Sequence, residues 1–411
     1  MRIVWLKAGK LLPVDTGGKI RSFNILRHLA TRHEMTVVSY YTGAADHAYE
    51  SALNAQFPGA ECVAVPMGAG AVGQALHYAP RFLFQLEPYS VTKYTSPLVT
   101  ARLRTVLTRR TPDVLICDFL AASLNVPRDV TTPSALFQHN VESALWERQA
   151  RYERNPVKRA VFAIEARKMF RYERATLARF DEIIAVSEHD KSLMHAMSPD
   201  APITVVPTGV DVTHYRRPGN AVASATPRVM FLGSMDWPAN IDGVEWFCDR
   251  IWPSVRARVP NAEFHVVGRN PPARITGLAS DSVKIVGGVT SVLPDLHAAS
   301  VFVVPLRIGG GTRLKIYEAM AASLPIVSTA VGAEGLEVSD GEDIVLEDDP
   351  SPFADAVSAL LVDEERRARI GAAALVTASR FDWSVIATDF EVVLRRAIVS
   401  AERPPVPQSP A

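Results

Sequence analysis

The chain is short of cysteines, of long apolar segments and of net charge, and each shortage excludes a class of protein. Only three of its 411 residues are cysteines, Cys62, Cys117 and Cys248, and they lie far apart in the sequence. That spacing fits neither a disulfide framework nor a metal or redox motif, and it is typical of a reducing compartment. No apolar run approaches the roughly 20 residues that a transmembrane helix needs, and residues 1–6 turn polar too early for a signal peptide. We therefore expect a cytoplasmic protein, attached at most to a membrane surface.

The absence of net charge bears on the partners of the protein. The chain has 44 Lys and Arg residues and 44 Asp and Glu residues, whereas proteins that bind the phosphate backbone of nucleic acids normally carry a basic excess. We therefore expect no nucleic-acid partner. The hydrophobic content of 48% is ample for large cores, and the length predicts about two or three domains.

Several nucleotide-binding and catalytic motifs are also missing. A long loop follows the first predicted strand, where a dinucleotide fold would place Gly-x-Gly-x-x-Gly in a tight turn. The sequence contains neither a P-loop nor Gly-x-Ser-x-Gly. It also lacks an Asp-x-Asp pair, which metal-dependent sugar transferases of another fold use to hold a divalent cation on the diphosphate. We expect no metal and no bound cofactor.

What the chain does contain is an alternation of short β-rich runs with helical stretches, which is typical of parallel α/β sheets. The runs of the first half are residues 3–6, 36–40, 63–65, 114–117, 135–137, 183–186 and 203–206. The runs of the second half are residues 229–232, 264–267, 283–286, 301–304, 326–329 and 344–346. A loose stretch of small residues at about 208–227 separates the halves. The sequence predicts two doubly wound, Rossmann-like domains with substrates beyond the C-terminal ends of the strands.

A glycine-rich segment at the exit of the run 301–304 is the most informative motif. It consists of Gly309, Gly310, Gly311, Thr312, Arg313, Leu314 and Lys315. Glycines that open a helix combine unpaired backbone N–H groups with the positive end of the helix dipole, and Arg313 and Lys315 add full charges, so the segment is typical of a phosphate site. Glu318, further along the helix, can accept two hydroxyl hydrogen bonds from a ribose. The alternative is a plain glycine turn capped by Thr312, with Glu318 at the surface.

With this segment the chain resembles the retaining GT-B glycosyltransferases of family 4, which transfer a sugar from a nucleotide-sugar to an acceptor. The resemblance runs nearly end to end and includes Gly17-Gly18, residues 206–211, residues 326–329 and residues 332–336. It implies an acceptor-side domain of residues 1–207 and a nucleotide-sugar domain of residues 208–382, facing each other across a cleft. It further implies that a helix at 383–401 crosses back to the first domain. The proline-rich tail, 402–411, is predicted to be disordered.

The loop before the first helix is a candidate part of the site. Gly17 and Gly18 allow close approach of a ligand to the backbone. Lys19 and Arg21 lie in the first helical turn, where the helix dipole disfavours a cation unless an anion is bound. We expect Gly17 and Gly18 on the donor and Lys19 and Arg21 on the acceptor side. The alternative is a flexible loop with solvated charges.

Two residues that follow the run 135–137 are further candidates. We expect His139 to hydrogen-bond a donor-sugar hydroxyl or to lend positive charge near the leaving group, and Glu142 to contact the acceptor. A satisfied structural histidine is the alternative. Many relatives carry a histidine at the end of the preceding strand, where this chain has Asp118. The resemblance therefore implies that Asp118 shares the role of His139 or takes it over.

The chain departs from the family pattern at the donor site. Gly310 stands eight residues before Glu318, where the family commonly has a glutamate. The loop after the first strand of the second half lacks the usual Arg and Lys and offers Asn240 instead. We expect Arg313 and Lys315 to supply the missing positive charge at the diphosphate, with Gly310, Gly311, Thr312 and Asn240 also on the donor.

These observations predict a metal-independent, retaining hexosyltransferase. It would move a sugar from a nucleotide-diphosphate sugar to a saccharide or lipid-linked acceptor, in the biosynthesis of a cell-surface polysaccharide or glycoconjugate. The protein would act mainly by stabilising charge on the departing diphosphate and by positioning both substrates. Two alternatives stay open: a catalytically silent, nucleotide-sugar-binding partner of another transferase, and a nucleotide-sugar epimerase or hydrolase on the same fold.

A basic segment lies between Trp146 and Phe180, with ten Lys or Arg residues and four Glu. Its apolar residues recur at helical separations and predict one packed stripe under a solvated basic face. They are Val157, Val161, Phe162, Met169, Phe170 and Leu177. The other interpretation is a peripheral contact with an anionic membrane or a lipid diphosphate. Residues 334–349, with eight Asp or Glu and no Lys or Arg, would keep the second domain off such a surface.

Overall fold

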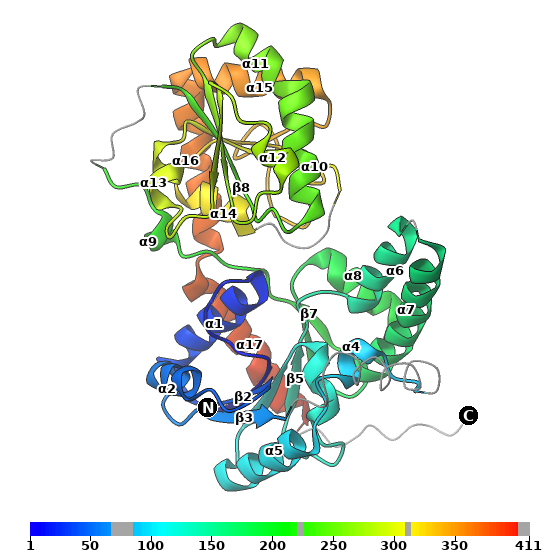
Figure 1. Cartoon of the computed structure of the whole chain (residues 1–411). Coiled ribbons are helices and arrows are strands. Elements are labelled where there is room, and N and C mark those ends of the chain that lie inside the picture. The colour runs from blue at the N-terminus through cyan, green and yellow to red at the C-terminus, as the bar shows by residue number, and fades with distance from the viewer. Residues whose placement is uncertain (67–84, 154, 220–225, 309–313, 402–411) are drawn as a thin grey trace. The chain divides into compact units, whose positions relative to one another are not determined.

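The computed structural model describes residues 1–66, 85–153, 155–219, 226–308 and 314–401 (Figure 1). Its contacts divide the chain into two compact units. Unit 1 comprises Met1–Pro207 with Ile386–Ala411, and unit 2 comprises Thr208–Val385. Two predictions fall outside the described residues, namely the disordered tail at 402–411 and the glycine segment 309–313.

Unit 1 is built on a seven-stranded parallel sheet in the order β3-β2-β1-β4-β5-β6-β7. Its strands are β1 Arg2–Ala8, β2 Glu34–Thr42, β3 Glu61–Val65, β4 Val114–Asp118, β5 Ser134–Phe137, β6 Glu182–Ala185 and β7 Ile203–Val205. Continuous apolar runs form these strands because helices cover both faces of a parallel sheet. The strand order reverses between β1 and β4, which defines the switch point where ligands of such sheets bind.

Unit 2 contains a six-stranded parallel sheet in the order β10-β9-β8-β11-β12-β13, which reverses between β8 and β11. Its strands are β8 Arg228–Leu232, β9 Glu263–Val267, β10 Val283–Gly287, β11 Val301–Val304, β12 Ile326–Ser328 and β13 Val345–Leu346. Every predicted β-rich run coincides with one of these strands or with a strand of unit 1. The expected fold class, two doubly wound Rossmann-like domains, is confirmed.

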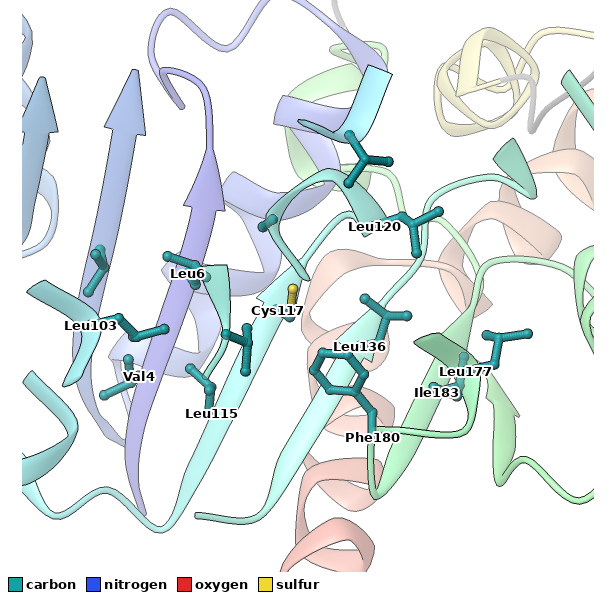
Figure 2. Packing of buried hydrophobic residues seen from close by; sticks show 14 of the residues in the cluster. Val4, Leu6, Leu103, Leu115, Cys117, Leu120, Leu136, Leu177, Phe180 and Ile183 are labelled. Atoms are coloured by element: carbon teal, nitrogen blue, oxygen red, sulfur yellow. The ribbon is translucent and has the colours of Figure 1, made fainter. Parts of the chain in front are cut away.

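Helices flank the sheet of unit 1. They are α1 Gly17–Ala30, α2 His47–Gln56, α4 Tyr89–Thr92, α5 Pro97–Arg110, η1 Leu120–Asn125, α6 Glu142–Tyr152, α7 Pro156–Leu177, α8 Glu188–Met197 and most of α17 Trp383–Ala401. Figure 2 shows how apolar side chains of adjacent strands gather on one face of the sheet, beneath residues such as Leu103 of α5 and Leu177 of α7. Those strand residues include Val4, Leu6, Leu115, Cys117, Leu136 and Ile183.

Unit 2 has its own helical layers and core. The helices are α9 Val212–Tyr215, α10 Pro238–Trp246, η2 Phe247–Ile251, α11 Trp252–Arg258, α12 Ala273–Thr276, α13 Leu293–Ala298, α14 Leu314–Ala321, α15 Pro350–Val362 and α16 Glu364–Arg380. Phe247 lies at the centre of an aromatic cluster, with ring centroids 4.5 Å from Phe264 and 6.0 Å from Phe353. Among the described residues of either unit, no helix combines the length and apolarity that crossing a bilayer requires.

The predicted packing of the basic segment is partly wrong. Met169 and Leu177 are buried as expected, but Val157 and Phe170 are 71% and 45% exposed. The segment also forms two helices, because Asn155 caps the start of α7 by accepting hydrogen bonds from two backbone N–H groups. The face of α7 that packs on the unit is completed by two glutamates instead of by the missing apolar residues.

Candidate functional site

A buried ion pair occupies the switch point of unit 1. Lys7 near the end of β1 places its Nζ atom 3.0 Å from Oδ2 of Asp118 at the end of β4, and the side chains are 3% and 0% exposed. The Trp5 indole N–H donates to the same carboxylate oxygen at 2.9 Å, and Lys7 also donates to Ser22 at 3.2 Å. Burial alone would raise the pKa of Asp118, but the Lys7 ammonium and a hydrogen bond from His139 hold it below its usual range.

His139 extends this network and is neutral. Its Nε2 atom lies 2.8 Å from Oδ1 of Asp118, and its Nδ1 atom lies 3.0 Å from a guanidinium nitrogen of Arg21. Since a guanidinium can only donate, Nδ1 accepts and the Nε2–H group donates to Asp118. Burial lowers the pKa of His139 to about 3, although Asp118 opposes the shift. The expectation that His139 lends positive charge is therefore wrong, and the ring has the contacts of a satisfied structural histidine.

The positive charges at the start of α1 have partners within unit 1. Lys19 forms an ion pair with Asp15 at 2.9 Å and donates to the Pro13 carbonyl at 3.1 Å. Arg21 is buried against the network just described. Gly18 is required because a Cβ atom there would lie 2.7 Å from Cζ of Phe119, whose ring stacks on His139. The inference that only a bound anion could balance Lys19 and Arg21 is therefore wrong, while a ligand contact at the exposed Gly17 stays a prediction.

A cavity of about 310 Å³ opens beside this network, near the ends of β1, β4 and β5. Ala8, Phe119 and Leu120 contribute apolar walls, and Glu142 and Lys93 contribute charge. Burial, together with the nearby carboxylate of Glu173, raises the pKa of Glu142 to about 7. The cavity therefore presents apolar surface and one carboxyl group that changes charge near neutral pH.

Glu173 fixes the position of Glu142 and was not identified from the sequence. Its carboxylate, 0% exposed, accepts the backbone N–H groups of Glu142 at 2.9 Å and Ser143 at 3.0 Å, as well as the Ser143 hydroxyl at 2.5 Å. It thus caps the start of α6 from α7, where the helix dipole favours negative charge. An acidic residue inside a strongly basic helix was the available signal.

The switch point of unit 2 brings together two predicted donor residues. Lys315 of α14 donates to the side-chain oxygen of Asn240 at 3.0 Å, and Asn240 donates to the Ser234 carbonyl at 2.8 Å. A Cβ atom on Gly233 would lie 2.9 Å from the Lys315 nitrogen. The ammonium of Lys315 therefore reaches the loop that follows β8, and glycine at 233 leaves room for it.

Glu318 lies one turn beyond Lys315 on α14 and has an unexpected neighbour. The hydroxyl of Tyr215, at the end of α9, donates to its Oε1 atom at 2.9 Å. Burial raises the pKa of Glu318, while Tyr215 and Lys315 oppose that shift. Residues three apart share a helix face, so the carboxylate and the ammonium lie on the same side of α14.

The loop after β9 supports the same region through residues that the sequence did not single out. Arg269 donates to the Ser234 hydroxyl at 3.2 Å and lies 3.3 Å from the Asp236 carboxylate. A side chain on Gly268 would collide with the Gly233 backbone, so the two loops touch directly. Of the remaining candidates, Gly310, Gly311, Thr312 and Arg313 lie outside the described residues. Within the described ranges, no group of three potential metal ligands occurs.

Comparison with known proteins first defines the class of fold. HepE from Anabaena, solved in complex with UDP, superposes on 96% of this chain and 100% of its own with a TM-score of 0.67 and 15% identity. WaaG, a glycosyltransferase involved in lipopolysaccharide biosynthesis, gives a TM-score of 0.63 at 16% identity over 95% of this chain and 99% of that one. The protein therefore has the GT-B fold.

Sequence comparison then relates each half of the chain to a family of glycosyltransferases. Residues 16–214 match the family described as Glycosyltransferase Family 4, and residues 226–363 match Glycosyl transferases group 1. The two matches thus lie in separate halves of the chain. A phosphatidyl-myo-inositol mannosyltransferase of Mycobacterium leprae is 28% identical over 51% of this chain and 57% of that protein. The alignments with curated relatives span between 35% and 62% of their lengths.

Proposed function

We propose that the protein is a nucleotide-sugar-dependent glycosyltransferase that binds its donor on unit 2. The observation that carries this proposal is the position of Lys315, whose ammonium lies at the Gly233–Asn240 loop while Glu318 lies one turn away on the same helix. A cation for a diphosphate and a carboxylate for ribose hydroxyls are thereby held at the switch point of a doubly wound sheet.

The contacts of Lys315 support the proposed relocation of positive charge. Asn240 lies on the loop where the family commonly has basic residues, and its side-chain oxygen accepts a hydrogen bond from the Lys315 ammonium. Arg313 is proposed as the second cation at the diphosphate. In this mechanism side chains and helix N–H groups stabilise the leaving diphosphate without a metal. The acceptor hydroxyl attacks the anomeric carbon on the face from which the diphosphate departs, so the anomeric configuration is retained, and the departing phosphate takes the hydroxyl proton.

The acceptor is proposed to bind unit 1 at the cavity beside Glu142. Its walls combine apolar surface with one carboxyl group, which suits a sugar ring with its hydroxyls. The acceptor would be a saccharide or a lipid-linked saccharide in cell-surface polysaccharide or glycoconjugate synthesis. The proposed location is the cytoplasmic side of a membrane, with peripheral attachment. The names of relatives that act on phosphatidylinositol compounds support a lipid-linked acceptor.

A donor panel tests the proposal. We would incubate the whole chain with GDP-mannose, UDP-glucose and related nucleotide-sugars, with and without lipid-linked acceptors, and measure released nucleoside diphosphate. Acceptor-dependent release that persists in excess chelator is expected, with NMR of the product showing a retained anomer. Donor binding without any release would instead identify a silent binding partner. Loss of activity in chelator, restored only by Mg²⁺ or Mn²⁺, would contradict the metal-independent mechanism.

A further inference from the structure

The acidic residues of α7 do not reach its surface. Glu165 is 2% exposed and accepts the backbone N–H of Tyr89 at 3.0 Å, and Glu173 caps α6. Both carboxylates are therefore used inside unit 1. The sequence count of four glutamates in the basic segment consequently overstates the negative charge available to a partner on this helix.

The exposed surface of α7 carries cations instead. They are Lys158, Arg159, Arg167, Arg171 and Arg174. None of these five side chains has an ion pair with another residue in the part of the chain that the structure describes. Because most surface cations elsewhere in unit 1 face a carboxylate, as Arg104 faces Asp129, this row differs from an ordinary solvated face.

Apolar side chains stand among these cations. Val157, Ile164 and Phe170 are 71%, 41% and 45% exposed. Val157, Ile164 and Arg171 follow one another at seven-residue intervals, which is close to two helical turns, so they form a single stripe along the solvent side. Exposed cations and exposed apolar side chains on one helix supply the two contributions, electrostatic attraction and apolar burial, that bind a protein to an anionic bilayer surface.

A groove of about 480 Å³ continues this apolar surface between α6, α7 and α8. Small and apolar residues such as Ala144, Ala163 and Leu193 line it, and Arg167 and Phe170 belong both to the groove and to the exposed face. The acidic residue on the rim, Glu147, is offset by Arg151 at 3.6 Å. Figure 1 shows α6 and α7 side by side, which is consistent with one continuous surface.

We propose that this surface, defined by the five cations with Val157, Ile164 and Phe170, docks on a bilayer of anionic phospholipid. The cations would lie among the headgroups while the three apolar side chains enter the interface and the methylene stems of Arg and Lys extend along it. The inference deepens the proposed function, since a lipid-linked acceptor would be met at this surface. A nucleic acid fits less well, because apolar side chains interrupt the basic row.

Vesicle sedimentation with the whole chain tests the proposal. Vesicles of phosphatidylcholine alone should not bind, whereas vesicles with about 30 mol% phosphatidylserine should bind and release the protein as salt is raised. Reversing Arg171 and Arg174 to glutamate should lower partitioning by roughly thirtyfold or more, since each cation near such a surface contributes about fivefold. Arg366→Glu with Arg369→Glu on α16 makes the same charge change elsewhere and should have little effect.

The apolar contribution has its own pair of variants. Ile164→Ser with Phe170→Ser should weaken binding that survives at high salt. Val362→Ser with Val376→Ser, which removes two apolar side chains that are still more exposed in unit 2, should not. Unchanged melting temperatures would show that the variants are folded.

Three outcomes would overturn the proposal. They are equal binding to neutral and anionic vesicles, equal losses in test and control variants, and a change of oligomeric state in the α7 variants with vesicle binding intact, which would make the surface a contact between copies of the chain. Donor turnover measured on the same preparations separates this inference from the proposed function. Vesicle binding without turnover would support the docking surface and contradict the proposed enzymatic activity.

Discussion

The two switch points place basic side chains in opposite environments. In unit 1, Lys7 faces the carboxylate of Asp118 with almost no exposure, and the adjacent histidine is neutral. In unit 2, the partly exposed Lys315 donates to an amide. A cation that is fully buried in an ion pair contributes to structure, whereas a partly exposed cation can still approach an anionic ligand. This difference is why we propose a structural role for the unit 1 network and donor binding for unit 2.

The largest expected effect concerns the buried ion pair of unit 1. Asp118→Asn leaves Lys7 buried without its counter-charge, so the free energy of unfolding should fall by about 3–5 kcal/mol. Denaturant unfolding measures the change. Lys7→Met in the same chain should recover most of the loss, because the double variant no longer buries the Lys7 ammonium without its counter-charge. A stable Asp118→Asn variant with impaired turnover would instead give the ion pair a catalytic role.

The second prediction concerns Lys315. Its replacement by alanine should slow donor turnover by roughly a hundredfold or more, since a preorganised charge at the leaving group is lost. Lys284→Ala, at a partly exposed lysine of the same unit, is the control. Arg313→Ala should act similarly, and Ser234→Arg should restore part of the rate by returning charge to the loop after β8. Near-parental kinetics in both alanine variants would refute the relocation of charge.

A smaller effect is expected at Glu318. Glu318→Gln keeps the shape of the side chain but loses charge-assisted acceptance, which contributes about 1.5–3 kcal/mol. Donor affinity should therefore fall by roughly ten- to a hundredfold, with little change in the melting temperature. Tyr215→Phe, which removes only the neighbouring hydroxyl, should cost less. Donor binding by Glu318→Gln at parental strength would exclude a ribose contact.

The smallest expected effect is on the pH dependence of the folding stability. Because the folded protein raises the pKa of Glu142 from 4.5 to about 7, the folded state keeps a proton that the unfolded chain releases. This carboxyl group therefore lowers stability as the pH rises from 4.5 to about 7, and adds no further change above that. Glu142→Gln should make the decline of stability over this pH range shallower, whereas Glu147→Gln, exposed on the same helix, should leave it unchanged. Parallel curves for both variants would count against the pKa shift.

The sequence predicted the sheets well because β-branched apolar runs and their spacing are local signals. The missing basic residues of one loop and the extra ones of another also led us to group Lys315 with Asn240, and the two side chains are in contact, while their role at a donor site stays a prediction. The sequence could not predict the contacts of Lys7, Glu173 or Tyr215, since these depend on which strands and helices become neighbours. The error at His139 has the same origin, because its charge depends on burial and on Asp118, 21 residues away.

The most direct test of donor binding on unit 2 is calorimetric titration of the whole chain with nucleosides and with their diphosphates. UDP and GDP should be compared with uridine and guanosine for the parent, Lys315→Ala and Glu318→Gln. If Lys315 faces the diphosphate and Glu318 the ribose, the lysine variant should lose affinity for the preferred diphosphate while binding the nucleoside normally. The glutamate variant should lose affinity for both. Equal affinities for the diphosphate in the parent and Lys315→Ala would contradict the account.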